Sequence, residues 1–399
     1  MDSQKSRQTI ENLRKIHEES LILNPTENIP FCSDVNLDFL EGMYISEEMR
    51  NENSKVIFAG RGNLNELYDF WCKYMNAKAV TFKPHSGLDA HISVFMSLGQ
   101  IGEKVLLLPE EAGGHFSTHQ ILSRLGFDVR SFMIDKEQYK VDILRSIELI
   151  ENWKPDYIFV DRSEGLYYED FSWLKEISCI KIFDASQYLT NIMAKDYDNP
   201  FDMGFDIILT SLHKNYPGSQ KAAVFFRQKD ELWEQVMKGL NIYISNIHPK
   251  DVCSLLLNLP SDSNLKKYSQ KMLSTTRLLE EILVKNHLPV VRRNFNNTWT
   301  QHLWLQPENK ERAYQFFRLL EDLHILTNYR LLPYGLGYGL RLGTAAAVRQ
   351  GLEEKSVPAL AEVISKNTYS SSALIMPFLS KSGINLDGGI ISLFSLLYS

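Results

Sequence analysis

The chain has 399 residues, a formal net charge of −6, 44% hydrophobic residues and 23% charged residues. These values are ordinary for a globular enzyme long enough for two domains, and the charge gives no reason to expect nucleic acid or an anionic membrane as a partner. Residues 1–15 lack the apolar core of a secretory signal, and no apolar run approaches the ~20 residues that a membrane span needs. We therefore expect a cytoplasmic protein.

The N-terminal residues combine a helical pattern with a polar loop. Apolar spacing over residues 11–19 predicts a short amphipathic arm. Two prolines and two asparagines in residues 21–30 predict an ordered loop without regular structure. This loop either only connects the arm to the body or brings the Thr26 hydroxyl to a site. Further on, Glu41 adds a carboxylate, and residues 56–60 end on a glycine suited to a tight turn.

A helix start in the next part of the chain is a candidate anion site. Helical spacing covers residues 63–76, and residues 80–90 lead into a second helix that continues to Leu98. Small residues at a helix start leave backbone N–H groups available for a phosphate, which makes Ser86 and Gly87 candidates. Simple capping of the helix by Ser86 explains this window equally well.

The sequence does not indicate a metal site. His115 and His119 have the i,i+4 spacing of zinc ligands on a helix, but no Glu lies between them and no third ligand is near. Stacking on a planar cofactor, or structural hydrogen bonding, suits His115 better. The four cysteines form no Cys-x-x-Cys pair, so neither zinc nor a disulfide framework is expected; they are Cys32, Cys72, Cys179 and Cys253.

Strand patterns recur through the middle of the chain, at residues 104–109, 157–160, 180–183, 207–209 and 222–226. Helical patterns such as residues 142–153 lie between several of them, and this alternation predicts a mainly parallel α/β sheet. Asp184 ends one strand, and Lys214 follows another after residues 210–213 leave the sheet. Such strand ends commonly bind ligands. A lysine could form a Schiff base with a carbonyl cofactor, and a carboxylate could keep a pyridine nitrogen protonated. A solvated lysine and a capping aspartate are the plainer readings of each residue alone.

After about residue 260 the pattern becomes helical, over residues 266–285 and 310–323, around a shorter strand at 300–305. We expect a second, smaller α/β domain here. Arg341 lies on a strand-like run between glycines and could bind a carboxylate through two hydrogen bonds, or form an ordinary ion pair. The predicted division is an arm and loop over residues 1–50, a large cofactor-binding domain over 51–260 and a small domain over 261–399.

These windows, in this order, resemble the serine hydroxymethyltransferase family of fold-type I, aspartate-aminotransferase-like, pyridoxal-phosphate enzymes. Thr-Ser-Leu-His-Lys, ending at Lys214, and Gly-Leu-Arg-Leu-Gly-Thr, ending at Thr344, carry the similarity most specifically, and it extends from about residue 21 to 352. The resemblance implies roles for several residues. They are Lys214 as the Schiff-base lysine, Asp184 at the pyridine nitrogen, His115 on the ring, Ser86 and Gly87 at the phosphate, Ser163, His213 and Gln187 as further cofactor contacts, Arg341 and Thr26 at the substrate carboxylate, and Glu41 as acid or base.

The chain departs from the family mainly where folate binds. Ile57 replaces a tyrosine that stacks on folate, Phe116 replaces a folate-contacting leucine, and Arg330 stands near a folate-contacting asparagine. Phe39 and Gln220 replace a tyrosine and an arginine of the family's motifs, and residues 245–250 lack the Gly-Gly turn that a partner subunit offers the phosphate. We therefore expect pyridoxal phosphate as the cofactor and no need for tetrahydrofolate.

The resemblance implies chemistry at the α-carbon of a small amino acid. Our first hypothesis is aldol-type cleavage or formation of the Cα–Cβ bond, as in a hydroxymethyltransferase, aldolase or transaldolase. Transamination or β-elimination, a folate-dependent hydroxymethyltransferase, and a non-catalytic binding or scaffolding protein are the alternatives. By resemblance we also expect a homodimer with shared active sites.

Overall fold

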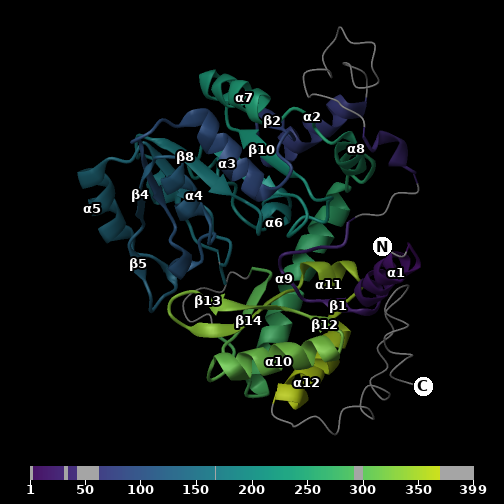
Figure 1. The fold of residues 1–399 in the computed structure, drawn as a ribbon. Coiled ribbons are helices and arrows are strands. Elements are labelled where there is room, and N and C mark those ends of the chain that lie inside the picture. Colours follow the sequence, from purple (N-terminus) through teal and green to yellow (C-terminus); the bar gives the residue numbers. More distant parts are fainter. Residues whose placement is uncertain (1–2, 31–34, 43–62, 167, 292–299, 369–399) are drawn as a thin grey trace. The chain divides into compact units, whose positions relative to one another are not determined.

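A computed structural model describes residues 3–30, 35–42, 63–166, 168–291 and 300–368. Residues 56–60 with Ile57, Cys32 and the end of the chain after residue 368 lie outside the described residues. The chain forms two compact units (Figure 1). The large unit is Pro30–Ser269, and the small unit combines Met1–Ile29 with Gln270–Ser399. The division at residues 50 and 260 stays a prediction.

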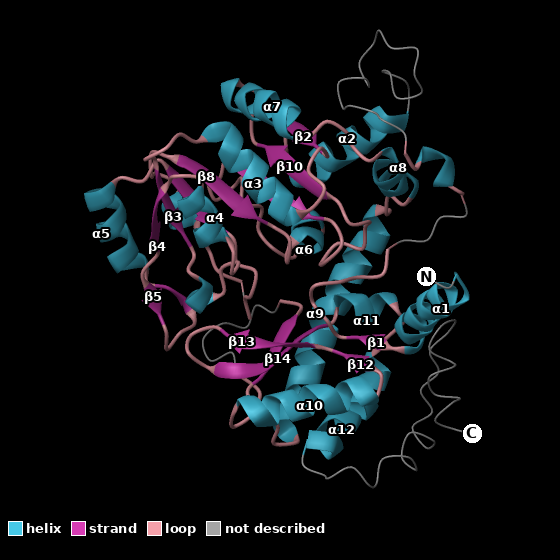
Figure 2. Ribbon diagram, viewed as in Figure 1, coloured by secondary structure: helices cyan, strands magenta, loops and turns pink. Residues whose placement is uncertain are grey.

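The large unit contains a seven-stranded sheet with the strand order β2-β10-β9-β8-β7-β3-β4 (Figure 2). β10 runs antiparallel to β2 and β9, and the other neighbouring pairs are parallel, which confirms the mainly parallel sheet. β5 and β6 form a separate, two-stranded antiparallel sheet. The strands are β2 Ala79–Thr81, β3 Lys104–Leu107, β4 Asp128–Ser131, β5 Ile134–Asp135, β6 Lys140–Val141, β7 Tyr157–Val160, β8 Ile180–Asp184, β9 Ile207–Ser211 and β10 Ala222–Phe226.

Both faces of this sheet are buried, which explains the continuous apolar runs of its central strands. Ile208 of β9 belongs to one core cluster together with Trp71, whereas its neighbour Leu209 belongs to another together with Phe95. Helices therefore cover the sheet on two sides. The helices of the large unit are α2 Asn63–Met75, α3 Gly87–Leu98, α4 Thr118–Arg124, α5 Ile143–Trp153, α6 Leu189–Met193, α7 Glu231–Tyr243 and α8 Pro249–Leu257, and α9 Asp262–Lys285 extends across the unit boundary.

α3 is the helix that positions the site. It begins after Ser86, whose hydroxyl oxygen accepts from the Asp89 N–H group at 3.1 Å. Its buried stripe packs toward the sheet, and α7 lies close against it, since a Cβ atom on Gly239 would come within 2.1 Å of Ser97 Oγ. The stripe contains Gly87, Ala90, His91, Val94, Phe95 and Leu98.

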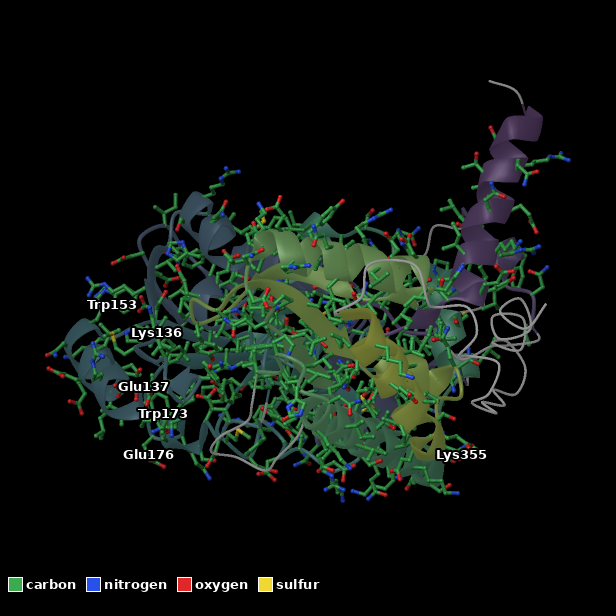
Figure 3. All side chains as sticks on the ribbon, turned by 90° about the horizontal axis from the view of Figure 1, so that it is seen from below. Lys136, Glu137, Trp153, Trp173, Glu176 and Lys355 are labelled. Atoms are coloured by element: carbon green, nitrogen blue, oxygen red, sulfur yellow. The ribbon has the colours of Figure 1, made fainter. Side chains whose placement is uncertain are left out.

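Aromatic side chains close the β4 side of the large unit. The guanidinium of Arg130, on β4, lies 4.7 Å from the centre of the Trp153 ring at the end of α5. Phe132 meets Trp173 edge to face with 6.1 Å between ring centres. Figure 3 labels both tryptophans on this part of the molecule. The amphipathic spacing of α5 thus serves to fix the sheet's outer strand.

The small unit contains a three-stranded antiparallel sheet with the order β11-β14-β13, and a parallel pair, β1 with β12. Its core contains leucines from helices and from strands, such as Leu279, Leu320 and Leu342. The expected smaller α/β domain is thus present. Its elements are α1 Ser3–Glu19, β1 Leu21–Ile22, β11 His302–Leu305, α10 Lys310–Asp322, β12 Ile325–Leu326, β13 Asn328–Leu332, β14 Gly337–Gly343, α11 Ala345–Arg349 and α12 Val357–Thr368.

Two local predictions were wrong. Residues 21–22 form strand β1 because they pair with β12, although the loop was expected to have no regular element. β9 continues through Thr210 and Ser211, which were expected to have left the sheet. His115 precedes α4, which begins at Thr118 and contains His119. Among the described helices, none is long and apolar enough to cross a membrane.

Candidate functional site

The candidate site lies where two neighbouring parallel strands end. Asp184 is the last residue of β8, and its Cα partner on β9 is Leu209. Ser211 ends β9, and Lys214 lies in the bend that follows. Because the carboxyl ends of parallel strands meet at one edge of the sheet, Asp184 and Lys214 share the edge at which open α/β sheets bind ligands.

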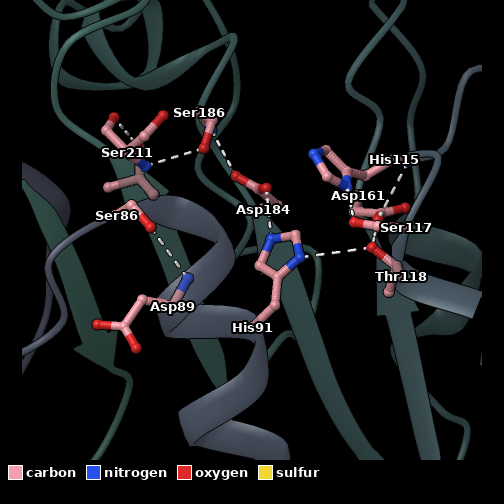
Figure 4. Close-up of polar contacts among 11 residues, drawn as sticks. Ser86, Asp89, His91, His115, Ser117, Thr118, Asp161, Asp184, Ser186 and Ser211 are labelled. Atoms are coloured by element: carbon pink, nitrogen blue, oxygen red, sulfur yellow. Dashed lines mark hydrogen bonds and ion pairs between the residues drawn. The ribbon is translucent and has the colours of Figure 1, made fainter. Parts of the chain in front are cut away.

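The start of α3 lies against this edge. A Cβ atom on Gly87 would be 3.3 Å from Ser211 Cβ and 3.5 Å from Ser186 Oγ, and the Ser211 N–H group donates to Ser186 Oγ at 2.8 Å (Figure 4). The Ser211 hydroxyl oxygen is buried and has no hydrogen-bond partner among the described residues. Buried hydroxyl groups normally have a partner, so this oxygen is suited to a ligand at the helix start.

Asp184 is held as a carboxylate. Its Oδ1 atom accepts from the Ser186 N–H group at 2.7 Å, and its Oδ2 atom lies 2.8 Å from His91 Nε2. Burial by itself would raise the pKa of Asp184, but the hydrogen bond from His91, the charge of Lys214 and a hydrogen bond from Ser186 lower this pKa to about 2. At neutral pH the site therefore presents a buried negative charge.

The backbone that follows Lys214 is held in place by hydrogen bonds of the Asn215 side chain. The next residue, Asn215, is fully buried, its Oδ1 atom accepts from the Thr190 N–H group at 2.7 Å, and its Nδ2 group donates to Asn191 Oδ1 at 3.0 Å. Lys214 itself is half-buried, and its positive charge acts on the carboxylate of Asp184. The role of this amine as the Schiff-base lysine stays a prediction.

His213 is a neutral ring at physiological pH. Burial lowers its pKa to about 4, and the neighbouring charge of Lys214 adds to this effect. Its Nδ1 atom is buried without a hydrogen-bond partner in the described part of the chain. Like the Ser211 hydroxyl, this nitrogen can still bind a polar ligand group.

His115 joins the same cluster from another loop. Its backbone N–H group donates to Asp161 Oδ2 at 3.2 Å, and its ring Nδ1 atom is 2.9 Å from Ser117 Oγ. Its ring meets that of His91 edge to face, with 5.7 Å between the ring centres (Figure 4). The loop is pressed tightly against residues 161–164, because a Cβ atom on Gly113 would be only 2.2 Å from the Glu164 carbonyl oxygen. Gly113 also has a φ of +88°, which favours glycine.

Two further predicted cofactor contacts lie on the loops that carry these residues. Ser163 is half-buried, and its N–H group donates to the Asp161 carbonyl oxygen at 2.6 Å. Gln187 is buried in the turn that follows Asp184. Both therefore belong to loops of the cluster, and their contacts with a cofactor stay predictions.

Glu41 has other contacts than the Asp184 cluster. Its side chain is 72% exposed, and its carboxylate lies 2.9 Å from Lys250 Nζ, which also binds Asp38. Hydrogen bonds that Lys250 donates to Glu41 and Asp38 raise the pKa of Lys250. The predicted acid or base is thus exposed and ion-paired at the surface of its own large unit.

The two predicted carboxylate-binding residues lie together within the small unit. Arg341 is buried on β14, between Trp304 of β11 and Asn328 of β13 in the sheet register. The loop of Thr26 packs on the end of this strand: the Gly343 N–H group donates to the Leu23 carbonyl oxygen at 2.7 Å, and a Cβ atom on Gly343 would be 2.5 Å from Pro25 Cβ. Thr26 Oγ1 donates to Asn24 Oδ1 at 2.8 Å, which shapes the loop.

Sequence reasoning missed several members of the cluster, and only one of them had left a signal. His91 is a single ionisable residue in the apolar stripe of α3, a position where a buried histidine needs a partner. No spacing rule could pair it with a carboxylate so far along the chain. The missed residues are His91, Thr118, Asp161, Ser186 and Ser211.

The donor set fits pyridoxal phosphate. A buried carboxylate suits the pyridine nitrogen, an amine suits the carbonyl carbon, and a helix start with an unpartnered buried hydroxyl suits the phosphate. In contrast, the described residues contain no group of three histidine, cysteine, aspartate or glutamate side chains that could hold a metal ion.

The fold and this donor set define a fold-type I pyridoxal-phosphate enzyme. The family model described as serine hydroxymethyltransferase matches residues 63–364, and the chain belongs to this family. The resemblance, the cofactor and the assignment as a transferase or aldolase-like enzyme are thereby confirmed.

Known proteins are similar over most of the chain. The serine hydroxymethyltransferase of Saccharolobus solfataricus is 26% identical over 86% of this chain and 84% of its own, and that of Aeropyrum pernix is 28% identical over 87% and 83%. The crystal structure of L-threonine transaldolase from Pseudomonas fluorescens has a TM-score of 0.82 at 20% identity and covers 99% of this chain and 91% of the transaldolase chain. This last likeness shows the fold.

Proposed function

We propose that the protein makes or breaks the Cα–Cβ bond of a small β-hydroxy amino acid, in an aldol-type reaction that uses an aldehyde rather than a folate. The observation that carries the proposal is the buried carboxylate of Asp184 on the same sheet edge as Lys214. When bound, pyridoxal phosphate supplies an electron sink for the charge left at Cα, provided that its pyridine nitrogen stays protonated. Asp184, a carboxylate at neutral pH, would accept a hydrogen bond from that nitrogen and so keep the proton on it.

Other residues of the large unit would bind and orient the cofactor. Lys214 would hold its carbonyl carbon covalently and, once displaced by the substrate's amino group, would be an amine able to move a proton. Gly87 and Ser86 at the start of α3, with the buried Ser211 hydroxyl and neutral His213, would hold the phosphate. The ring of His115 would cover the pyridine face and exclude water.

Residues of the small unit would choose the substrate. The Arg341 guanidinium would bind the α-carboxylate through two parallel hydrogen bonds, and Thr26 would assist. Since such a pairing fixes the orientation of the α-carbon, it also decides which of its bonds breaks.

Glu41 would take the proton from the substrate's β-hydroxyl group. Its exposure suits a group offered to a second copy of the chain, as the family resemblance implies for a homodimer with shared sites. Release of Glu41 from Lys250 would leave it as an ordinary carboxylate base. We therefore propose that one subunit's Lys214 works with the other subunit's Glu41.

Folate independence rests on the substitutions at the folate-contacting positions, Ile57, Phe116 and Arg330. Phe116 is 53% exposed and lies beside His115, with 4.9 Å between their ring centres. An exposed apolar ring at this position is suited to an apolar aldehyde. Threonine is the first substrate to test, because the solved protein of the same fold is named a threonine transaldolase.

The test is aldehyde release from L-threonine and other β-hydroxy amino acids, with and without tetrahydrofolate. We expect release of acetaldehyde from threonine, or its exchange for an added aldehyde, at a rate that tetrahydrofolate does not change. Lys214→Ala serves as the inactive control. Keto-acid formation without an aldehyde would point to transamination or elimination, and acceleration of serine cleavage by tetrahydrofolate would restore the folate-dependent alternative.

A further inference from the structure

A line of buried polar groups leads away from Asp184 into the large unit. Asp184 Oδ2 lies 2.8 Å from His91 Nε2, and His91 Nδ1 lies 3.4 Å from Thr118 Oγ1 (Figure 4). Thr118 Oγ1 lies 2.8 Å from Asp161 Oδ2. Two carboxyl groups on the neighbouring strands' ends are thus joined through one imidazole and one hydroxyl.

All four groups are almost fully removed from water. His91 is 3% exposed and lies among apolar and aromatic neighbours, with the Phe159 ring edge to face at 4.9 Å. Thr118 is 2% exposed and Asp161 is 0% exposed. In such surroundings each hydrogen-bond donor and acceptor needs a partner. A line of polar groups with only some of its hydrogen bonds formed would be less stable than apolar side chains in the same place.

Asp161 differs from Asp184 in its electrostatics. Burial raises the pKa of Asp161 well above the ordinary value, and the charge of Asp184 raises it further, although the Thr118 hydroxyl and the His115 amide oppose this. Its Oδ1 atom has no hydrogen-bond partner among the described residues. A neutral carboxyl group tolerates such an oxygen far better than a carboxylate does.

The presence of a proton on Asp161 decides which group donates and which accepts in each hydrogen bond of the line. Thr118 has one hydroxyl hydrogen, which can point to Asp161 or to His91 Nδ1, but not to both. If Asp161 is neutral, it donates to Thr118, Thr118 donates to Nδ1, and the Nε2–H group donates to the Asp184 carboxylate. Every N–H and O–H group of the line then has an acceptor, and the negative charge of the line lies on Asp184, at the end that faces the site.

We propose that His91 is a positioning residue that holds the Asp184 carboxylate toward the cofactor, and that Thr118 and a neutral Asp161 fix the ring of His91 for this purpose. The inference rests on the proposed role of Asp184 at the pyridine nitrogen. Residues that do not touch the cofactor would then help to determine how strongly its ring withdraws electrons. The Oδ2 atom bound by His91 cannot turn away, so Oδ1 and its Ser186 contact are fixed as well.

The experiment reads the protonation of the pyridine nitrogen directly. Protein is reconstituted with pyridoxal phosphate carrying ¹⁵N in the ring, and the ring-nitrogen resonance is measured by NMR. We expect a protonated nitrogen in the wild-type protein and in Asp161→Asn, whose amide can donate to Thr118 as a neutral carboxyl group does. His91→Leu should shift the resonance toward the unprotonated value and weaken cofactor binding about tenfold.

Thr118 provides the sharper pair of variants. Thr118→Val keeps the shape but removes the hydroxyl, and should shift the resonance in the same direction as His91→Leu by a smaller amount. Thr118→Ser should restore the wild-type position. Thr276→Val, which removes an equally buried hydroxyl from α9 in the small unit, should leave the resonance unchanged.

Each outcome decides between the two claims. An unprotonated nitrogen in the wild-type protein would remove the proposed role of Asp184, and with it the basis of the inference. A protonated wild-type nitrogen that stays in place in both His91→Leu and Thr118→Val would overturn only the role of His91. If His91→Leu does not fold, as judged by circular dichroism, the Thr118→Val and Thr118→Ser pair decides the matter alone.

Discussion

Gly87 and Ser211 approach so closely that a Cβ atom on the glycine would lie 3.3 Å from the Cβ atom of the serine. The contact joins the first residue of α3 to the last residue of β9. Backbone N–H groups at the helix start and a buried hydroxyl with no partner among the described residues thus face the same small region. A phosphate there would be bound without any positively charged side chain in the first turn.

Gly87→Ala tests this arrangement. The added methyl group should push Ser211 away by a few tenths of an ångström and weaken pyridoxal-phosphate binding about tenfold, or ~1.4 kcal/mol. Alanine is a better helix former than glycine by up to ~1 kcal/mol, so the cofactor-free protein should melt no earlier than the wild type. Absorbance titration and thermal melting measure the two effects. Leu88→Ala, at the exposed next position, is the control, and an unchanged affinity in Gly87→Ala would contradict the proposed phosphate site.

Lys214 should be the residue that carries the cofactor. Borohydride reduction of the holoprotein followed by peptide mass mapping should find the cofactor mass on Lys214 and on no other lysine. Lys221 is the most demanding comparison, because it is fully buried in the same unit, and its Nζ atom already donates to the Lys83 carbonyl oxygen at 3.1 Å. Lys221→Met should still be labelled, whereas Lys214→Ala should not. Label on Lys221 in the wild-type protein would remove Lys214 from its role.

Arg341→Lys should weaken binding of the amino acid without loss of the cofactor. Lysine keeps the positive charge but cannot form two parallel hydrogen bonds, so we expect the KM for the amino acid to rise about 10–100-fold. The cofactor's dissociation constant should stay as in the wild type. Arg318→Lys, on the exposed side of α10, controls for the substitution itself. An unchanged KM would assign the buried guanidinium a purely structural role.

Shared active sites predict complementation between two inactive variants. Glu41→Gln and Lys214→Ala should each lose nearly all activity as separate proteins. If one subunit's Glu41 serves the other subunit's Lys214, co-refolded mixtures should regain about a quarter of wild-type activity, because half of the dimers would be mixed and one site in each would be complete. Mixtures that stay inactive, while size-exclusion chromatography shows mixed dimers, would place both residues in one subunit's site.

The elements that sequence predicted well are those whose pattern is local. β7 and β10 match the predicted residues 157–160 and 222–226, because a strand buried on both faces is a continuous apolar run. The end of β9 was missed because Thr210 and Ser211 are polar. They stay in the sheet because they pair with Ala223 and Ala222 of β10.

The residues of the candidate site also fall into those that a local sequence pattern marks and those that only distant contacts bring together. The positions of Lys214 and Asp184 at the strand ends could be predicted, because apolar runs and motifs mark them in the sequence. His91 could not, because its position in an apolar stripe shows only that it is buried, and its partners Asp184 and Thr118 come from other parts of the chain. Likewise β1 exists only through pairing with β12, which no local pattern shows.

The pH dependence of stability should reveal the buried lysine Lys221, which lies beside the histidine His85. Lys221 Nζ lies 3.0 Å from His85 Nδ1, and since an ammonium group only donates, this nitrogen must accept and the ring must be neutral. The His85 ring also stacks on that of His248 with 3.8 Å between centres. Burial, then the charge of Lys221, then that of His248 lower the pKa of His85 to about 4.

His85 should therefore take up a proton on unfolding between its unfolded pKa of ~6.5 and about 4. Stability from this group is fully present above that window and is lost as the pH falls through it. Because His85 is half-exposed, we expect only about 1–2 kcal/mol between pH 7 and pH 4.5, after allowance for screening by solvent. In His85→Asn, whose side-chain oxygen can accept from Lys221, the free energy of unfolding should fall less over this range. Urea unfolding at several pH values measures the difference, His17→Asn on the exposed face of α1 is the control, and equal slopes in wild type and His85→Asn would refute the assignment.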